Sequence, residues 1–120
     1  MSQTREQQRA LKAHAQVTAI PADLRDKYRT ATLKAQALVR NAGLCQALHF
    51  LQNKDKGAER LVTDLEAHLK EGRVIQQKLL EEVRQAPLPT YLAATREALQ
   101  CLVWQCRMVE SLNDEYEGVN

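Results

Sequence analysis

The chain has 120 residues, and its 17 Lys and Arg nearly balance its 15 Asp and Glu, so the formal net charge is +2. This length suits one domain with a single core, and we expect residues 1–120 to form that domain. Leu and Ala are abundant while Val, Ile, Gly and Pro are few, which excludes an all-β sandwich and a glycine-rich nucleotide-binding domain and favours helices.

The first predicted helix spans residues 4–20. Its apolar residues recur every three or four positions, as expected of one buried helix face. Thr4 is the expected N-cap, and Pro21 ends the helix.

The second predicted segment, residues 24–42, has the most regular apolar stripe in the chain. Tyr28 falls on this stripe and is therefore assigned to the core, and Asp23 is the expected N-cap. An apolar face continues to Leu51, so Gly43 either breaks the helix or lies within it at a close helix contact.

The second half of the chain predicts a loop and three helices, over residues 53–57, 58–71, 74–86 and 90–113. Two prolines, Pro87 and Pro89, break the chain before the last helix, which Thr90 caps. The apolar stripe of that helix begins at Leu92, and residues 114–120 form an acidic tail that we expect to fray. The predicted fold class is therefore all-α, a compact bundle of five or six helices.

The search for catalytic chemistry is negative. No phosphate-binding, zinc-protease or serine-hydrolase motif occurs in the sequence. Cys45 and His49 lie four positions apart, as a nucleophile and base or two metal ligands would, but no third group completes a site, so a core thiol and a helix-side imidazole are favoured. Asp64 and His68 share this spacing and are interpreted as a solvated pair. We expect no catalytic residue, no metal and no cofactor.

The cysteines indicate the cellular compartment. Three cysteines, Cys45, Cys101 and Cys106, occur without a secretory signal or a long apolar run. An odd number of thiols in such a chain predicts free cysteines and a cytoplasmic protein that does not contact membranes.

Positive charge is concentrated in the first half of the chain. Residues 1–56 carry a net charge of +6 and residues 57–120 carry −4, a division that suits a nucleic-acid surface or head-to-tail stacking of identical subunits. The chain is also predicted to contact phosphate and sugar rather than bases, because Phe50 and Trp104 are assigned to the core. The predicted nucleic-acid-binding residues form one basic stripe of Lys27, Arg29, Lys34, Arg40, Lys54 and Lys56, with Arg107 as a weaker candidate.

Four stretches, at Lys27-Tyr28-Arg29, Ala37 to Leu44, Gln46 to Lys54 and Tyr91 to Arg107, together resemble the small helical subunit of type III-B (Cmr) CRISPR effector complexes. That family shows a Tyr-Arg start, an Asn-Gly-Leu-type element and a Leu-x-Phe-Leu segment with a Lys after it. The matching residues here are Lys27-Tyr28-Arg29, Ala37 to Leu44, and Gln46 to Lys54. The family's closing pattern is matched by Tyr91, Thr95, Glu97-Ala98-Leu99, Trp104 and Arg107. Two positions depart from it: Gln36 lies where many members have a nearby Pro, and Ala42 replaces the usual Asn before the Gly.

The resemblance implies a non-enzymatic structural subunit of an RNA-guided antiviral complex. It implies that copies of the subunit stack beside the repeated backbone subunit of the Cmr complex and line the channel that holds guide RNA and target RNA, while other subunits cleave the target. Two alternatives stay open: a generic helical adaptor with no nucleic-acid role, and a small enzyme that uses Cys45 and His49.

Overall fold

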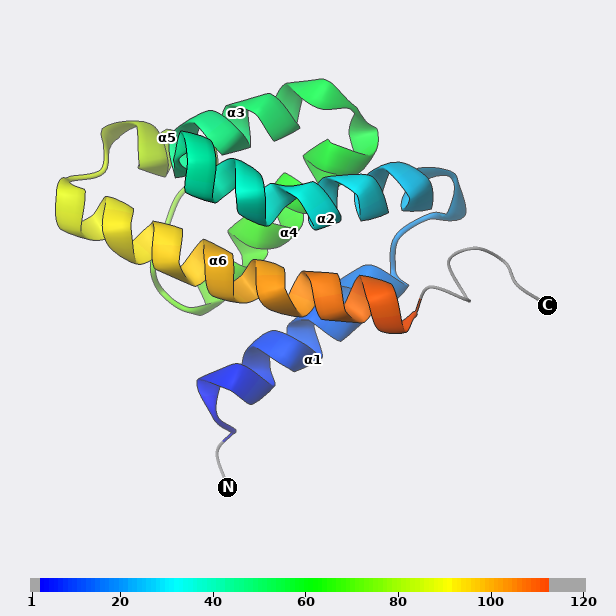
Figure 1. The fold of residues 1–120 in the computed structure, drawn as a ribbon. Coiled ribbons are helices and arrows are strands. Elements are labelled where there is room, and N and C mark those ends of the chain that lie inside the picture. The colour runs from blue at the N-terminus through cyan, green and yellow to red at the C-terminus, as the bar shows by residue number, and fades with distance from the viewer. Residues whose placement is uncertain (1–2, 113–120) are drawn as a thin grey trace.

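The structure is a computed structural model that describes residues 3–112, and this part of the chain contains helices and no strand (Figure 1). The helices are α1 (Arg5–Thr18), a short 3-10 turn η1 (Ala22–Leu24), α2 (Arg25–Ala42), α3 (Leu44–Lys54), α4 (Lys56–Glu71), α5 (Leu79–Gln85) and α6 (Leu88–Ser111). The predicted all-α bundle is confirmed. The predicted acidic tail, residues 114–120, lies outside the described residues.

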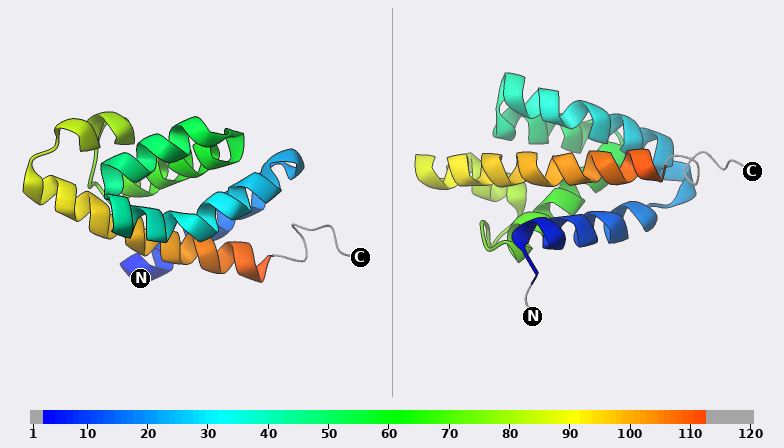
Figure 2. Two further views of the ribbon diagram at one scale, coloured as in Figure 1. Left: turned by 45° about the horizontal axis from the view of Figure 1, so that its top comes forward. Right: turned by 60° about the horizontal axis from the view of Figure 1, so that its bottom comes forward.

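Helix α6 extends across the molecule, with α1 along one side and α2 along the other (Figures 1 and 2). Helix α4 packs against both α2 and α3 and supplies the centre of the core. Leu61, Leu65 and Leu69 of α4 are fully buried, so α4 holds the other helices together by burial of apolar surface.

The first two helices differ in how they begin. At α1, the Thr4 hydroxyl accepts a hydrogen bond from the Gln7 amide at 3.0 Å, and the Thr4 amide donates to the Gln7 side chain at 2.9 Å. This reciprocal pair is a capping box, which confirms Thr4 as the N-cap. The prediction for Asp23 is wrong, because that residue lies within η1 and α2 begins with no side-chain cap.

Gly43 interrupts the helical structure between α2 and α3. Its φ of +88° is a conformation that glycine adopts at low cost. The predicted loop over residues 53–57 is wrong, because Asp55 alone separates α3 from α4 and its carboxylate caps Ala58 N at 2.8 Å. Gly57 lies inside α4 at a close helix contact, where a Cβ atom would come within 2.5 Å of Tyr28 N.

Helix α5 is shorter than the predicted helix over residues 74–86. Before this helix, the Glu82 carboxylate accepts hydrogen bonds from the backbone amides of Gln76 and Gln77, at 3.0 and 3.2 Å. The first amide of the helix, Leu79 N, donates to the Glu66 carboxylate at 2.8 Å. These side-chain acceptors replace the carbonyls of another helical turn, so the chain stays non-helical before α5.

Helix α6 begins earlier than expected, at Leu88. Pro89 lies in its first turn, where a missing N–H removes no helical hydrogen bond. Leu92, predicted to start the buried stripe, is 48% exposed. The residues that α6 buries are instead Ala94, Ala98, Cys101, Leu102, Gln105 and Val109. Within residues 3–112, no helix combines the length and apolar character needed to cross a membrane.

Candidate nucleic-acid interface

The basic residues of α2 lie on two flanks of that helix. Each residue of an α-helix turns the side-chain direction by about 100°, so Lys27 and Lys34, seven positions apart, share a flank. By the same geometry Arg29 and Arg40 point about 160° and about 140° away from Lys27. The one basic stripe expected from the sequence is therefore divided in two.

The first group contains Lys27, Lys34, Lys54 and Lys56, which we call the lysine edge. All four residues are exposed. The first turn of α2 lies directly against the α3–α4 junction, since a Cβ on Gly57 would lie 2.6 Å from the Lys27 Cβ. Lys54 and Lys56 are the last residue of α3 and the first of α4, so they gather beside Lys27.

The lysine edge keeps a positive balance. The Asp55 carboxylate lies 3.9 Å from the Lys54 ammonium group, and the Glu59 carboxylate lies 3.9 Å from the Lys56 ammonium group. Exposed ion pairs at such distances are weak and are screened by salt. Lys54 and Lys56 therefore lose little stability if another anion replaces these carboxylates.

The other candidates are Arg29 and Arg40 on the opposite flank of α2 and Arg107 on α6. Arg40 is exposed and donates to the Gln36 side chain at 3.4 Å, and the Gln36 amide in turn reaches Cys106 Sγ of α6 at 3.5 Å. Arg107 follows Cys106, and its guanidinium lies 5.0 Å from the centre of the Trp104 ring. Arg29, the remaining member, is half-buried.

Phe50 and Trp104, which were also assigned to the core, are more exposed than expected. Phe50 is 51% exposed, so its assignment is wrong. Helix α3 has a narrow buried face, and Leu44, Ala47, Leu48 and Leu51 fill it completely. Trp104 is half-buried, and its indole N–H donates to the Glu6 carboxylate at 2.9 Å.

The suspected Cys45–His49 pair has no built site around it. Both residues are half-buried, and the Cys45 backbone amide donates to the Tyr91 hydroxyl at 3.0 Å. Among residues 3–112, no three His, Cys, Asp or Glu side chains gather closely enough to hold a metal ion. The three thiols are free, as predicted.

Asp64 and His68 are buried, and their interpretation as a solvated pair is wrong. Tyr28 Oη donates to Asp64 Oδ2 at 2.6 Å and accepts from Gln105 Nε2 at 2.7 Å. The side-chain oxygen Oε1 of Gln105 lies 3.0 Å from His68 Nε2. The chain of donors thus requires His68 to carry its proton on Nε2. Sequence spacing placed Tyr28 in the core but held no signal for these partners, which come from two other helices, α4 and α6.

The pKa values of two side chains in the buried network, Asp64 and His68, are shifted. Burial raises the pKa of Asp64, although the hydrogen bond from Tyr28 and the nearby charge of Arg60 oppose that rise. Burial also lowers the pKa of His68, so the neutral ring is favoured. Both groups serve to join α2, α4 and α6.

Comparison with known proteins decides the family. The family model described as "CRISPR-associated protein (Cas_Cmr5)" matches residues 5–112. The chain belongs to the Cmr5 family. A relative from Thermus thermophilus, described as "CRISPR system Cmr subunit Cmr5", is 37% identical over 113 residues, which cover 93% of this chain and 98% of that protein. The crystal structure of a CRISPR-associated Cmr5 family protein from the same organism has a TM-score of 0.77 and 34% identity, covering 92% of this chain and 98% of that one. The predicted resemblance to the small subunit of type III-B (Cmr) complexes is thereby confirmed.

Several residues that carried this resemblance have structural roles in the Cmr5-family fold. Tyr28 is the centre of the buried network, and Gly43 separates α2 from α3 despite the Ala at position 42. The Tyr91 hydroxyl satisfies a free amide in the first turn of α3. These roles explain why the pattern predicted the fold.

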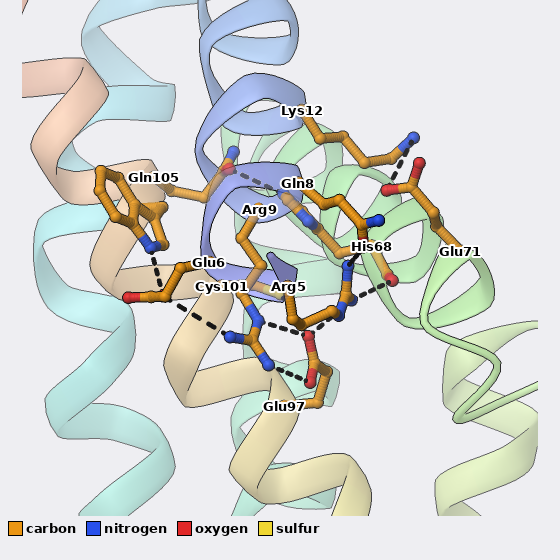
Figure 3. A network of polar contacts seen from close by, with 11 residues as sticks. Arg5, Glu6, Gln8, Arg9, Lys12, His68, Glu71, Glu97, Cys101 and Gln105 are labelled. Carbon is orange, nitrogen blue, oxygen red and sulfur yellow. Dashed lines mark hydrogen bonds and ion pairs between the residues drawn. The ribbon is translucent and has the colours of Figure 1, made fainter. Parts of the chain in front are cut away.

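Glu97 fastens the first helix of this Cmr5-family chain to the last (Figure 3). Its carboxylate accepts hydrogen bonds from Arg5 and Arg9 of α1, each at 2.8 Å. These two arginines hold the pKa of Glu97 at about 2, well below its ordinary value, against the opposing effect of burial. Arg5 also reaches the His68 carbonyl at 3.4 Å, so the same cluster joins α1 to α4.

Proposed function

We propose that this chain is a non-catalytic structural subunit of a Cmr complex in the cytoplasm, where its lysine edge contacts the backbone of guide and target RNA. The observation that carries the proposal is the convergence of Lys27, Lys54 and Lys56 at the α3–α4 junction, with Lys34 on the same flank of α2. Membership of the Cmr5 family supports a place beside the other Cmr subunits. The role in antiviral defence follows from that membership.

Lysines of this kind suit contact without sequence selectivity. Each ammonium group neutralises one phosphate and releases a counterion, so affinity falls with salt and depends little on base sequence. The lysine edge consists of two helix ends and one flank of α2. Because these helices pack together in one bundle, the relative positions of the four lysines on the backbone are fixed.

We also propose that copies of the subunit stack along the complex and contact its repeated backbone subunit. Apolar surface supports this part of the proposal. A hollow of about 430 Å³ between α1 and α6 is lined by Ala10, Leu11, His14 and Met108 together with two glutamines. Leu11 is 56% exposed there, and Leu88 at the other end of α6 is 67% exposed. Apolar patches at opposite ends of one molecule suit head-to-tail contacts.

The RNA contact is tested by assembling the complex with Lys27→Ala and Lys54→Ala combined in one chain. We expect weaker capture of target RNA and a salt dependence flattened by slightly less than one unit for each charge removed. A matched control is Lys70→Ala with Lys78→Ala, which removes two exposed lysines elsewhere. Equal affinity and equal salt dependence for the two double variants would contradict the RNA contact and favour the adaptor function.

A further inference from the structure

We propose that Phe50 is a stacking platform for an unpaired RNA base beside the lysine edge. This inference rests on the proposed function and adds to it: the RNA that reaches this surface is contacted through a base as well as through its phosphates.

The ring of Phe50 has no role in the core. It is 51% exposed, while the four apolar residues that face the core on α3 are buried. An aromatic ring left in water forgoes the stabilisation that burial would bring, so its exposed half suits a contact with another molecule.

The ring lies on the flank of α3 that is turned towards α2. Gln52 marks the other flank, because its amide donates to Glu59 of α4 at 3.2 Å. Phe50 is two positions from Gln52 and therefore points about 160° away from it around the helix. Lys54 is one turn after Phe50 and shares its flank.

Helices α2 and α3 pack against each other and run side by side in Figure 1. The flank of α2 that carries Lys27 and Lys34 is the one in contact with the α3–α4 junction. The Phe50 ring is therefore bordered by the lysine edge, with Lys54 one turn away on its own helix.

The charge and chemistry of this surface favour RNA over a protein partner. Helix α3 contains no Asp or Glu, so no carboxylate of that helix repels a phosphate near the ring. A lysine-lined surface with an aromatic ring is the combination that binds single strands, because any base can stack on the ring while lysines hold the backbone. Protein interfaces are instead depleted in lysine. A base in a duplex is already stacked on its neighbours, so the site selects an unpaired one.

The test compares two RNAs and three variants of the full chain. The probes are a fluorescein-labelled single-stranded oligouridylate and an abasic RNA of the same length and charge, each titrated at low salt by fluorescence anisotropy. We expect Phe50→Ala to weaken oligouridylate binding about five-fold or more and to leave binding of the abasic RNA unchanged. Phe50→Tyr keeps the ring and should bind both probes as the unaltered chain does. Leu92→Ala, which truncates a similarly exposed apolar side chain on α6, is the matched control and should change neither affinity.

Each contrary result has a definite meaning. Equal oligouridylate affinity for Phe50→Ala and the unaltered chain would overturn the stacking platform, and loss of complex assembly by that variant would assign the ring to a protein contact. An equal loss on both RNAs, with helicity retained, would also overturn it, since the ring would then only shape the surface. If Lys27→Ala with Lys54→Ala weakens binding while Phe50→Ala does not, the proposed function stands and the stacking fails. No binding of either RNA by the unaltered chain would overturn the stacking platform, while the proposed function is decided by the assembled complex.

Discussion

Replacing Tyr28 with Phe removes one oxygen atom from the centre of the core. That oxygen is fully buried, donates to Asp64 Oδ2 at 2.6 Å and accepts from Gln105 Nε2 at 2.7 Å. The phenyl ring of the variant fills the same space, so no cavity opens beyond the lost hydroxyl. The substitution therefore isolates the cost of leaving two buried polar groups without their shared partner.

The expected cost is about 3–4 kcal/mol of unfolding free energy at neutral pH, because a buried group left unsatisfied costs about 1–3 kcal/mol and a charged one more. Asp64 keeps one partner, since Arg60 Nε lies 3.5 Å from its other oxygen, and this contact holds the total below the sum of the two upper limits. Such a loss is a large part of the 5–15 kcal/mol, roughly, by which single domains are stable.

The loss should also depend on pH. Burial raises the pKa of Asp64 above 3.8, and the hydrogen bond from Tyr28 opposes this rise. Without that bond the pKa of Asp64 rises further, so the folded variant holds its proton to a higher pH than the unfolded chain does. A group that binds protons more tightly when folded makes stability fall as pH rises. The difference between the variant and the unaltered chain should thus be widest at neutral pH and narrowest near pH 4, roughly the usual range of the carboxyl.

The measurement is urea unfolding followed by far-ultraviolet circular dichroism across this pH range. Tyr91→Phe is the matched control: its half-buried hydroxyl accepts one hydrogen bond, from Cys45 N, and its loss should cost about 1 kcal/mol or less at every pH. The reasoning is refuted if Tyr28→Phe costs no more than the control, or if its cost is the same at all pH values.

Three further predictions concern stability. The pKa of His68 is lowered in the fold, so its contribution to the free energy of unfolding is present above pH 6.5 and is lost as the pH falls below that value. His68→Gln should remove this part of the pH dependence of stability, measured by unfolding experiments between about pH 8 and about pH 5. Glu97→Gln should cost about 2 kcal/mol at neutral pH by weakening the contact with two arginines of α1. The pKa of Glu97 is held at about 2, so its contribution is present above 4.5 and lost as the pH falls towards 2; equal acid sensitivity of the variant and the unaltered chain would contradict this. Gly57→Ala should cost about 2–3 kcal/mol, since the new Cβ meets backbone of α2, whereas Gly72→Ala meets the movable end of an arginine and should cost less; calorimetry of the two variants checks the order.

The fold class could be predicted from the sequence because it depends on local composition and period. The 3.6-residue spacing of apolar residues is visible in the chain itself and placed Tyr28 in the core, and capping preference placed Thr4 at a helix start. Helix ends were harder to place, because several of them depend on distant side chains. Leu79 N, for example, is satisfied by Glu66, and no local rule near position 79 points to that partner.

The candidate site, like the fold, could be predicted from the sequence only in part. The sequence identified the exposed lysines, since charge is read directly from residue type. The grouping of these lysines was decided by the contact between Gly57 and the first turn of α2, which lies thirty positions away in the chain. Exposure of Phe50 was also beyond sequence reasoning, because an apolar residue on a helix is buried only if a neighbouring helix covers its flank.

The sequence by itself determined that this chain is helical and basic in its first half, and its motifs predicted the Cmr5 family that the comparisons confirmed. The tertiary structure alone decided that Asp64 and His68 are buried, because Tyr28 and Gln105 approach them from α2 and α6. Helical period orders side chains around one axis, whereas the partners of a buried polar group depend on how several axes pack together.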